Sequence, residues 1–355
     1  MGQDRDRANS PPVEIYGPEG LRMWLRVAIR YSVSRIVPPY RVHEIMDVPM
    51  APEWDFNQRI RRYYFNAGRH RQRSGHHDGR WGAKGLSGED STNWISQANR
   101  MQLAPSSLYG EIEGGRDIYP IYDHPMSTDG APVWEVEDEE DVKVYAAPMS
   151  HGIPCLGYVV DEQPRPGRLR NEYVEPIVRR NVVALKKAGF AIPMKAMAVI
   201  KNLKPGSEFT FPDGTVVTQE DAVEPPRRGR KVVLCGDTAD SRSMLNLAKG
   251  ADVVIHECTN AYLPGVDKDT TLRDVTRDAV VHGHSTPQIA GEFCRSAGAK
   301  RLVLNHFSAR YKGDISADSM SIMMRIEKQA MKAAQLNETQ VAAAWDLMVL
   351  PVPQN

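Results

Sequence analysis

The stretch KVVLCGDT, residues 231–238, is a short apolar run that ends in a glycine, an aspartate and a threonine. Two later stretches have the same form, ADVVIHECT at 251–259 and KRLVLNHFS at 300–308. Helix-like segments at Ser243–Lys249 and Pro287–Ser296 separate the three runs. Short apolar runs between helical segments are typical of buried strands in a parallel sheet. The sequence therefore predicts an α/β fold.

Four predicted strands end in an imidazole or carboxylate side chain. VKVYAAPMS is followed by His151, and the three runs above lead to Asp237, Glu257 and His306. Loops at the carboxyl ends of strands are where sites form in α/β sheets. Histidine and aspartate are also ligands that suit zinc or a related divalent ion. Each residue alone has a structural explanation, but the four together favour a site.

The composition is that of an ordinary soluble globular protein, with 41% hydrophobic and 25% charged residues. Lys and Arg balance Asp and Glu at 45 each, so the net charge predicts no partner. The four cysteines form no Cys-x-x-Cys, which argues against a disulfide framework or a thiolate zinc site. The sequence shows no transmembrane run and no secretory signal. We expect an intracellular protein whose cysteines fill core space.

Several segments depart from this regular pattern. Residues 51–130 show little periodicity and include a basic run, so we expect a partly disordered insertion there. Residues 163–206 are rich in Arg, Lys and Pro and predict an excursion from the main body. Near the start we expect a strand at Val13–Tyr16 and then a helix whose buried stripe includes Trp24. A last strand is expected within AAWDLMVLPVP, residues 343–353.

The loop HGHST, residues 282–286, stands directly before the helix predicted at 287–296. Ser285 or Thr286 can cap that helix, and Pro287 suits its first position. The helix therefore does not need the histidines, and the residues alone leave open whether His284 does chemistry or belongs to a polar loop.

The sequence resembles the ribonuclease Z family of tRNA 3′-processing endoribonucleases, its short form in particular. The resemblance is carried, in chain order, by SHGIPCLGY, VLCGDTADS, VVIHECTNA, HGHSTPQIA and LVLNHFSARY. PPVEIYGPEGL, VHEI and DLMVLPVP fit as well. The family belongs to the metallo-β-lactamase superfamily. The resemblance thus implies one αββα sandwich over residues 1–355, incomplete at its N-terminus, with residues 163–206 as a protruding basic arm.

The resemblance also implies two zinc ions and roles for five residues. His151 resembles a ligand of one zinc and His306 a ligand of the other, and Asp237 resembles the aspartate that bridges both. His284 matches the extra histidine of the family, and Glu257 matches the glutamate of its HEAT-like motif, which reads HECT here. Two cations would activate a water and hold the phosphate, while His284, oriented by Glu257, would protonate the leaving 3′ oxygen.

Basic residues are the expected contacts to RNA. Arg165, Arg168 and Arg170 lie where the family carries its tRNA-binding arm, and Arg310 in HFSARY is expected to reach a phosphate near the metals. A solvated basic helix is the alternative reading of the arm. The implied partners are precursor tRNA and a second copy of the chain in a homodimer, with no membrane contact.

One element of the family is absent from this sequence. The His-x-His-x-Asp-His motif, which supplies ligands to both metals, does not occur. A fragment or mis-started gene model, one piece of a split enzyme, and a non-catalytic relative would each explain this, and we expect truncation. Residues 1–355 alone are then expected to bind zinc weakly, to show no cleavage, and to aggregate through an uncovered sheet edge.

Three functions follow from these observations. The main hypothesis is a zinc-dependent endoribonuclease that, when complete, removes the 3′ trailer from precursor tRNA. The alternative is a catalytically silent tRNA-binding or dimer-partner subunit, which need bind no metal. A third is another hydrolase of the same superfamily that acts on small phosphodiesters. Zinc content separates the first two, and a substrate panel separates the third.

Overall fold

The chain divides into two compact units in a computed structural model that describes residues 11–32, 38–49 and 109–353. Residues 50–108, the greater part of the predicted insertion, lie outside the described residues. Each unit is built around its own core. The first unit contains the described part of residues 1–138 with residues 143–160 and 231–350, and the second contains residues 139–142, 161–230 and 351–353.

The first unit begins with a small sheet of three parallel strands, in the order β1-β2-β3. Helix α2 (Leu21–Tyr31) packs on this sheet, where its Ile29 meets Tyr40 and Val42. The predicted buried stripe was wrong at Trp24, which is 63% exposed, because the helix turns Ile29 inward instead. The strands are β1 (Val13–Pro18), β2 (Tyr40–Ile45) and β3 (Asp117–Ile118). β3 lies within the predicted insertion at 51–130, so the described end of that insertion is part of the small sheet.

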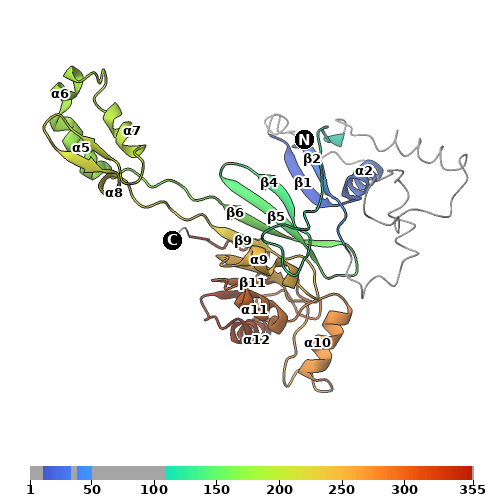
Figure 1. Ribbon diagram of the computed structural model, residues 1–355. Helices are drawn as coiled ribbons and strands as arrows, with labels where there is room; N and C mark the ends of the chain where they lie inside the picture. The colour runs from blue at the N-terminus through green and yellow to red at the C-terminus, as the bar shows by residue number, and fades with distance from the viewer. Residues whose placement is uncertain (1–10, 33–37, 50–108, 354–355) are drawn as a thin grey trace, which may run out of the picture. The chain divides into compact units, whose positions relative to one another are not determined.

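A seven-stranded sheet forms the centre of the unit, in the order β12-β11-β10-β9-β6-β5-β4 (Figure 1). β9, β10 and β11, which are the three predicted apolar runs, lie parallel to one another, and β12 is parallel to β11, whereas β4 and β5 are antiparallel. The strands are β4 (Trp134–Asp138), β5 (Val142–Met149), β6 (Cys155–Glu162), β9 (Lys231–Leu234), β10 (Val253–Glu257), β11 (Leu302–Asn305) and β12 (Val341–Ala343).

The last strand lies earlier than the sequence predicted. β12 ends at Ala343, which pairs with Leu304 of β11. Beyond it the chain leaves the sheet, and Leu347 has a positive φ of 64° and is 97% exposed. The apolar residues after Ala343 therefore do not form a buried strand.

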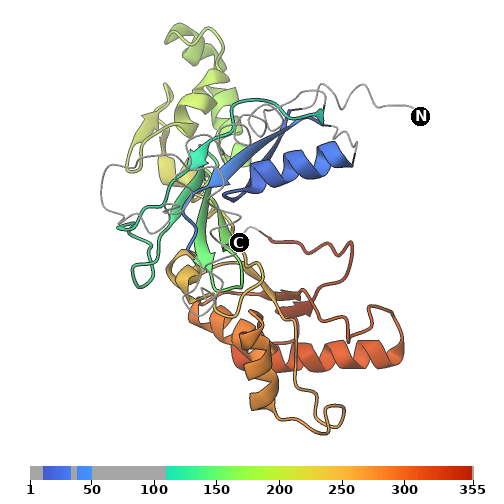
Figure 2. The same ribbon diagram turned by 90° about the vertical axis from the view of Figure 1, so that its right-hand side faces the viewer.

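Helices on one face and the small sheet on the other give the unit four layers (Figure 2). Phe293 of α11 and Ile326 of α12 share a core with Ala147 of β5. The neighbouring Ala146 points to the opposite face and packs with Ile45 of the small sheet. The order is therefore α2, small sheet, large sheet and α11 with α12, which is the αββα sandwich that the sequence implied. The helices that follow β6 in this unit are η3 (Arg242–Met244), α9 (Leu245–Ala248), α10 (Leu272–Val281), α11 (Pro287–Ser296) and α12 (Ala317–Ala334).

The second unit has a separate apolar core. Val174, Leu185 and Ile200 from its helices are buried together with Phe211 and Val217 from a two-stranded hairpin. Because the hairpin completes this core, the unit extends to Arg230 and not only to the predicted end at 206. Its elements are α5 (Asn171–Arg180), α6 (Val182–Lys187), α7 (Lys195–Lys201), β7 (Glu208–Thr210), β8 (Val216–Thr218) and α8 (Gln219–Ala222). Among the described residues, no helix has the length and hydrophobicity that crossing a bilayer requires.

Candidate metal centre

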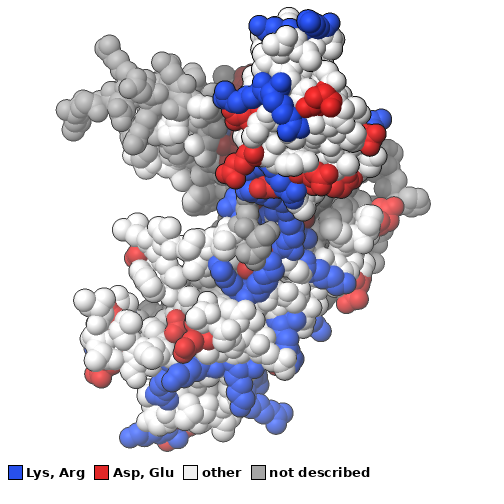
Figure 3. Space-filling view, turned by 90° about the vertical axis from the view of Figure 1, so that its left-hand side faces the viewer, with Lys and Arg blue, Asp and Glu red and all other residues white. Residues whose placement is uncertain are grey.

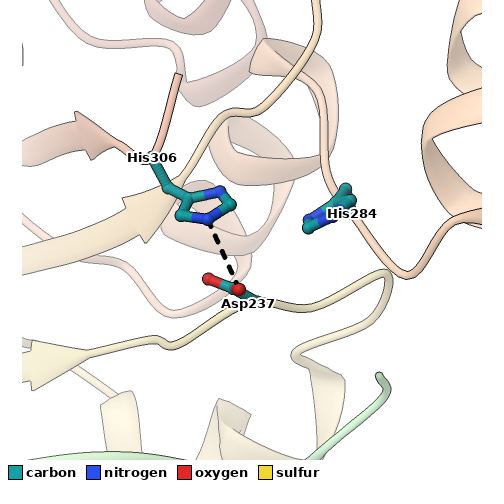
Figure 4. Close-up of side chains that lie close together, drawn as sticks. All are labelled: Asp237, His284 and His306. Atoms are coloured by element: carbon teal, nitrogen blue, oxygen red, sulfur yellow. Dashed lines mark ion pairs between the residues drawn. The ribbon is translucent and has the colours of Figure 1, made fainter. Parts of the chain in front are cut away.

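The carboxyl ends of β9, β10 and β11 bring three of the predicted site residues to one edge of the large sheet. Asp237 follows β9, Glu257 ends β10 and His306 follows β11, and these strands are neighbours. His306 Nε2 lies 3.4 Å from Asp237 Oδ2 (Figure 4). Parallel strands place their carboxyl ends side by side, so residues far apart in the sequence meet here.

The loop between α10 and α11 adds His284 to this cluster. Asp237, His284 and His306 each offer one ligand atom, and these atoms lie within 4.8 Å of one another (Figure 4). The His284 ring centroid is 5.3 Å from that of His306 and 5.3 Å from that of His151. His284 is therefore near both of the other rings, whereas His151 is not part of the group of three close ligand atoms found among the described residues.

The loop glycine Gly283 positions His151 through its backbone. The Gly283 carbonyl oxygen is 2.9 Å from His151 Nδ1. The glycine has a φ of +83°, and a Cβ there would lie 2.5 Å from the same His151 nitrogen. A side chain is thus excluded both by the left-handed backbone and by the imidazole.

We expect Gly283→Ala to lower zinc affinity about tenfold, because the added methyl displaces His151, which the sequence predicts as a zinc ligand. Gly250→Ala is the matched control, since Gly250 also has a positive φ of 67° but a Cβ there meets nothing within 4 Å. Both variants should lose about 1–3 kcal/mol of folding free energy from backbone strain. Thermal unfolding and a zinc titration against a chelator measure the two effects. Equal zinc affinity in the two variants would contradict the role of Gly283.

The buried carboxylate of Glu257 organises the back of the cluster. Glu257 is 1% exposed and accepts four hydrogen bonds, which fill the lone pairs of a carboxylate. One comes from His284 Nδ1 at 3.1 Å and one from the Thr259 hydroxyl at 2.6 Å. The backbone nitrogens of Thr238 and Thr259 donate the others, at 2.7 and 3.2 Å. Ser285 fixes the histidine loop to the same place, because its hydroxyl donates to the Thr238 carbonyl at 2.5 Å.

The hydrogen bonds of the three rings assign their tautomers. Nδ1 of His151 faces a carbonyl oxygen and Nδ1 of His284 faces Glu257, so both carry the proton. Nδ1 of His306 lies 2.8 Å from the Thr259 hydroxyl, whose own proton goes to Glu257. Nε2 of His151 and of His306 is then left with its lone pair, which is the form in which imidazole binds a metal, and Nε2 of His284 is the nitrogen turned away from Glu257. Nitrogen donors of this kind beside the Asp237 carboxylate fit a zinc ion.

Other polar groups near the cluster are engaged elsewhere. Burial raises the pKa of the Cys155 thiol to about 11, so it stays protonated at neutral pH and is a poor ligand. His256 is fully buried beside Ser241, and burial lowers the pKa of its ring, which keeps it neutral. His282 is exposed at the end of α10, where its Nδ1 contacts the Asp278 carbonyl oxygen at 2.8 Å. Neither His256 nor His282 belongs to the group of close ligand atoms among the described residues.

The residues predicted to bind RNA lie in different settings. The Arg310 guanidinium is paired with Asp267 at 2.9 Å and donates to the Ala261 carbonyl at 2.6 Å, so it ties two loops together. Arg170 donates to backbone carbonyls of α8. Arg165 and Arg168 are exposed, and the side chain of Arg168 forms no ion pair with the residues that the structure describes.

Sequence reasoning missed the groups that orient the histidines. Thr259 and Thr238 contact Glu257, and Gly283 contacts His151. One local signal was present, because Thr259 stands two positions after Glu257 in HECT, where its hydroxyl can turn back to the carboxylate. The contact of Gly283 joins residues 132 positions apart and leaves no local signal.

Comparison with individual known proteins places the chain in a family, although no family model matches it. Ribonuclease Z of Brevibacillus brevis is 30% identical over 239 residues, which are 65% of this chain and 67% of the relative. The chain belongs to the ribonuclease Z family.

Other ribonuclease Z relatives match with different coverage. Ribonuclease BN of Cronobacter sakazakii is 33% identical over 204 residues, and the chain spans 57% of that relative's length. The human zinc phosphodiesterase ELAC protein 1 is 29% identical over 359 residues, which are 99% of this chain and 77% of the relative. Ribonuclease Z proteins are hydrolytic nucleases of the metallo-β-lactamase superfamily, and the αββα layers of the first unit agree with that membership.

Proposed function

We propose that the protein is a zinc-dependent endoribonuclease that removes the 3′ trailer from precursor tRNA. The observation that carries the proposal is the cluster of Asp237, His284 and His306, with buried Glu257 behind His284. The names of the relatives, ribonuclease Z and zinc phosphodiesterase, support the same metal and the same class of bond. Precursor tRNA and a second copy of the chain are the proposed partners.

Three residues are proposed to hold zinc. His151, Asp237 and His306 present donors of the type that zinc prefers, and the Asp237 carboxylate can serve two ions with its two oxygens. When bound, zinc supplies an activated water and neutralises charge on the phosphate. Asp237 and His306 are partly exposed, with 39% and 46% of their side chains accessible, so an RNA phosphate can approach them.

His284 is proposed to deliver the proton that the leaving 3′ oxygen needs. Its Nδ1 is held by Glu257, and its side chain keeps 21% of its surface exposed while Glu257 is buried. Nε2 is therefore the nitrogen that substrate can reach. Glu257 therefore holds the ring with Nε2 toward the substrate, which is the orientation that a general acid requires.

The second unit is proposed to bind the tRNA backbone. Arg168 and Lys201 line one pocket together with Asn171 and Met197. Figure 3 shows Lys and Arg side chains gathered at one end of this unit. The exposed lysines of this unit are Lys186, Lys187, Lys195, Lys201 and Lys204. Such a surface contacts phosphates without reading sequence.

We expect the pair of changes Arg168→Gln and Lys201→Gln to weaken binding of precursor tRNA. Each removed cation should lower the slope of log affinity against log salt by about one. Lys249→Gln with Lys332→Gln is the control, because both lysines are exposed on the first unit and the net change of charge is the same. Binding is measured by fluorescence anisotropy over a salt series. An unchanged slope in the first pair would remove these residues from the RNA-binding surface.

The proposed activity is tested with the full product of the gene, zinc and a radiolabelled precursor tRNA. We expect one cut after the discriminator nucleotide, a 3′ hydroxyl on the tRNA, and loss of cleavage on chelation. Metal-free protein that binds the same tRNA without cutting it would favour the silent subunit instead. Cleavage of small phosphodiesters without cleavage of the tRNA would favour the third function.

A further inference from the structure

Thr259 lies at the meeting point of the proton donor and the metal cluster. Its hydroxyl oxygen is 2.6 Å from Glu257 Oε2, 2.8 Å from His306 Nδ1 and 3.4 Å from His284 Nδ1. No other side chain in the described residues contacts all three of these groups. The side chain is only partly buried, so its position is set by these contacts as much as by packing.

The direction of each hydrogen bond follows from what the groups can donate. A carboxylate only accepts, and the contact to Glu257 is the shortest, so the single hydroxyl proton of Thr259 goes to Glu257. The hydroxyl oxygen is then free to accept from His306 Nδ1. Glu257 thus fixes the tautomer of His306 through Thr259, just as it fixes that of His284 directly.

His306 needs such a restraint. Its backbone has a positive φ of 55°, which is strained for a non-glycine residue. Its side chain is 46% exposed, so little packing holds the ring. The Thr259 hydroxyl lies 3.0 Å from the His306 carbonyl oxygen as well as 2.8 Å from the ring nitrogen. Because the single hydroxyl proton goes to Glu257, the contact to the ring nitrogen is the hydrogen bond that holds His306.

We propose that Thr259 is a positioning residue. Its hydroxyl is held by Glu257 and in turn holds Nδ1 of His306, so that Nε2 of His306 is directed to zinc. This inference rests on the proposed zinc site. It means that one buried carboxylate orients both the proposed proton donor and a proposed metal ligand. Loss of the hydroxyl should then weaken the binding of metal, an effect that a purely structural threonine would not have.

Zinc affinity of Thr259→Val, measured by chelator competition on the full gene product, tests the proposal. Valine keeps the shape and removes the hydroxyl, and the expected loss is about tenfold or more, the usual effect of removing a group that holds a metal ligand. The visible spectrum of the cobalt-substituted protein should also change. Thr259→Ser keeps the hydroxyl and should restore both affinity and spectrum. Thr259→Ala replaces the valine variant if the latter does not fold.

Ser241→Ala is the matched control. It removes a hydroxyl that lies 3.0 Å from Nε2 of the buried His256, which is turned away from the metal cluster. We expect lower thermal stability there with unchanged zinc affinity. A Thr259→Val or Thr259→Ala protein with wild-type zinc affinity and cobalt spectrum would overturn the role of Thr259 alone. Wild-type protein that binds no zinc would overturn the proposed metal centre, and this inference with it.

Discussion

His284→Ala is expected to lower the rate of precursor tRNA cleavage by about a hundredfold or more while zinc stays bound. The His284 ring keeps Nδ1 on Glu257 at 3.1 Å, so only Nε2 can serve the substrate. His151, Asp237 and His306 remain in place in this variant, and they are the proposed ligands. The loss should therefore fall on the chemical step and not on the binding of metal.

Single-turnover cleavage and zinc content per chain, measured on the same preparation of the full gene product, separate these effects. His282→Ala is the matched control, because His282 stands two positions away in the same loop and is exposed at the end of α10. It should cleave at the wild-type rate. Parallel loss of zinc and activity in His284→Ala would make His284 a metal ligand and would contradict the role of proton donor.

Asp237→Ala is expected to remove both zinc and activity, with an affinity loss of more than about a hundredfold. Losing a direct ligand should exceed the tenfold to hundredfold loss typical of its supporting contacts. Asp237 stands at the carboxyl end of β9, and its carboxylate is 3.4 Å from His306 Nε2. No other carboxylate joins the metal cluster among the residues that the structure describes.

Asp240→Asn provides the comparison for this variant. Asp240 is three positions away and pairs with the Arg242 guanidinium, so its carboxylate is already engaged. This variant should keep zinc and cleavage. Zinc is counted by atomic emission after dialysis, and cleavage is assayed in the same buffer. Full zinc content in Asp237→Ala would show that the metal lies elsewhere.

The sequence predicted the site's framework because the information is local. Each apolar run and the polar residue that follows it are adjacent in the chain, and parallel strands necessarily place such residues at one edge. For this reason the pattern of residues alone was enough to group Asp237, Glu257 and His306. Family resemblance was needed to distinguish their roles.

Groups that depend on distant partners could not be predicted. The ion pair of Arg310 with Asp267 joins residues 43 positions apart and gives no periodic signal, and the contact of Arg310 to a phosphate stays a prediction. Trp24 matched a helical stripe, yet the position of the small sheet selects the inward face, and Ile29 occupies it. The apolar residues after Ala343 had the composition of a buried strand, but strand pairing with β11 ends at Ala343.

Anomalous diffraction at the zinc edge, from crystals of the full gene product grown with zinc, tests the central claim most directly. We predict a peak at about 2.0–2.2 Å from a carboxylate oxygen of Asp237 and from Nε2 of His306, which is ordinary zinc–ligand geometry. His284 Nε2 should lie outside that distance, with its Nδ1 still on Glu257. A peak that is absent from this cluster, or one at ligand distance from His284 in place of His306, would contradict the account.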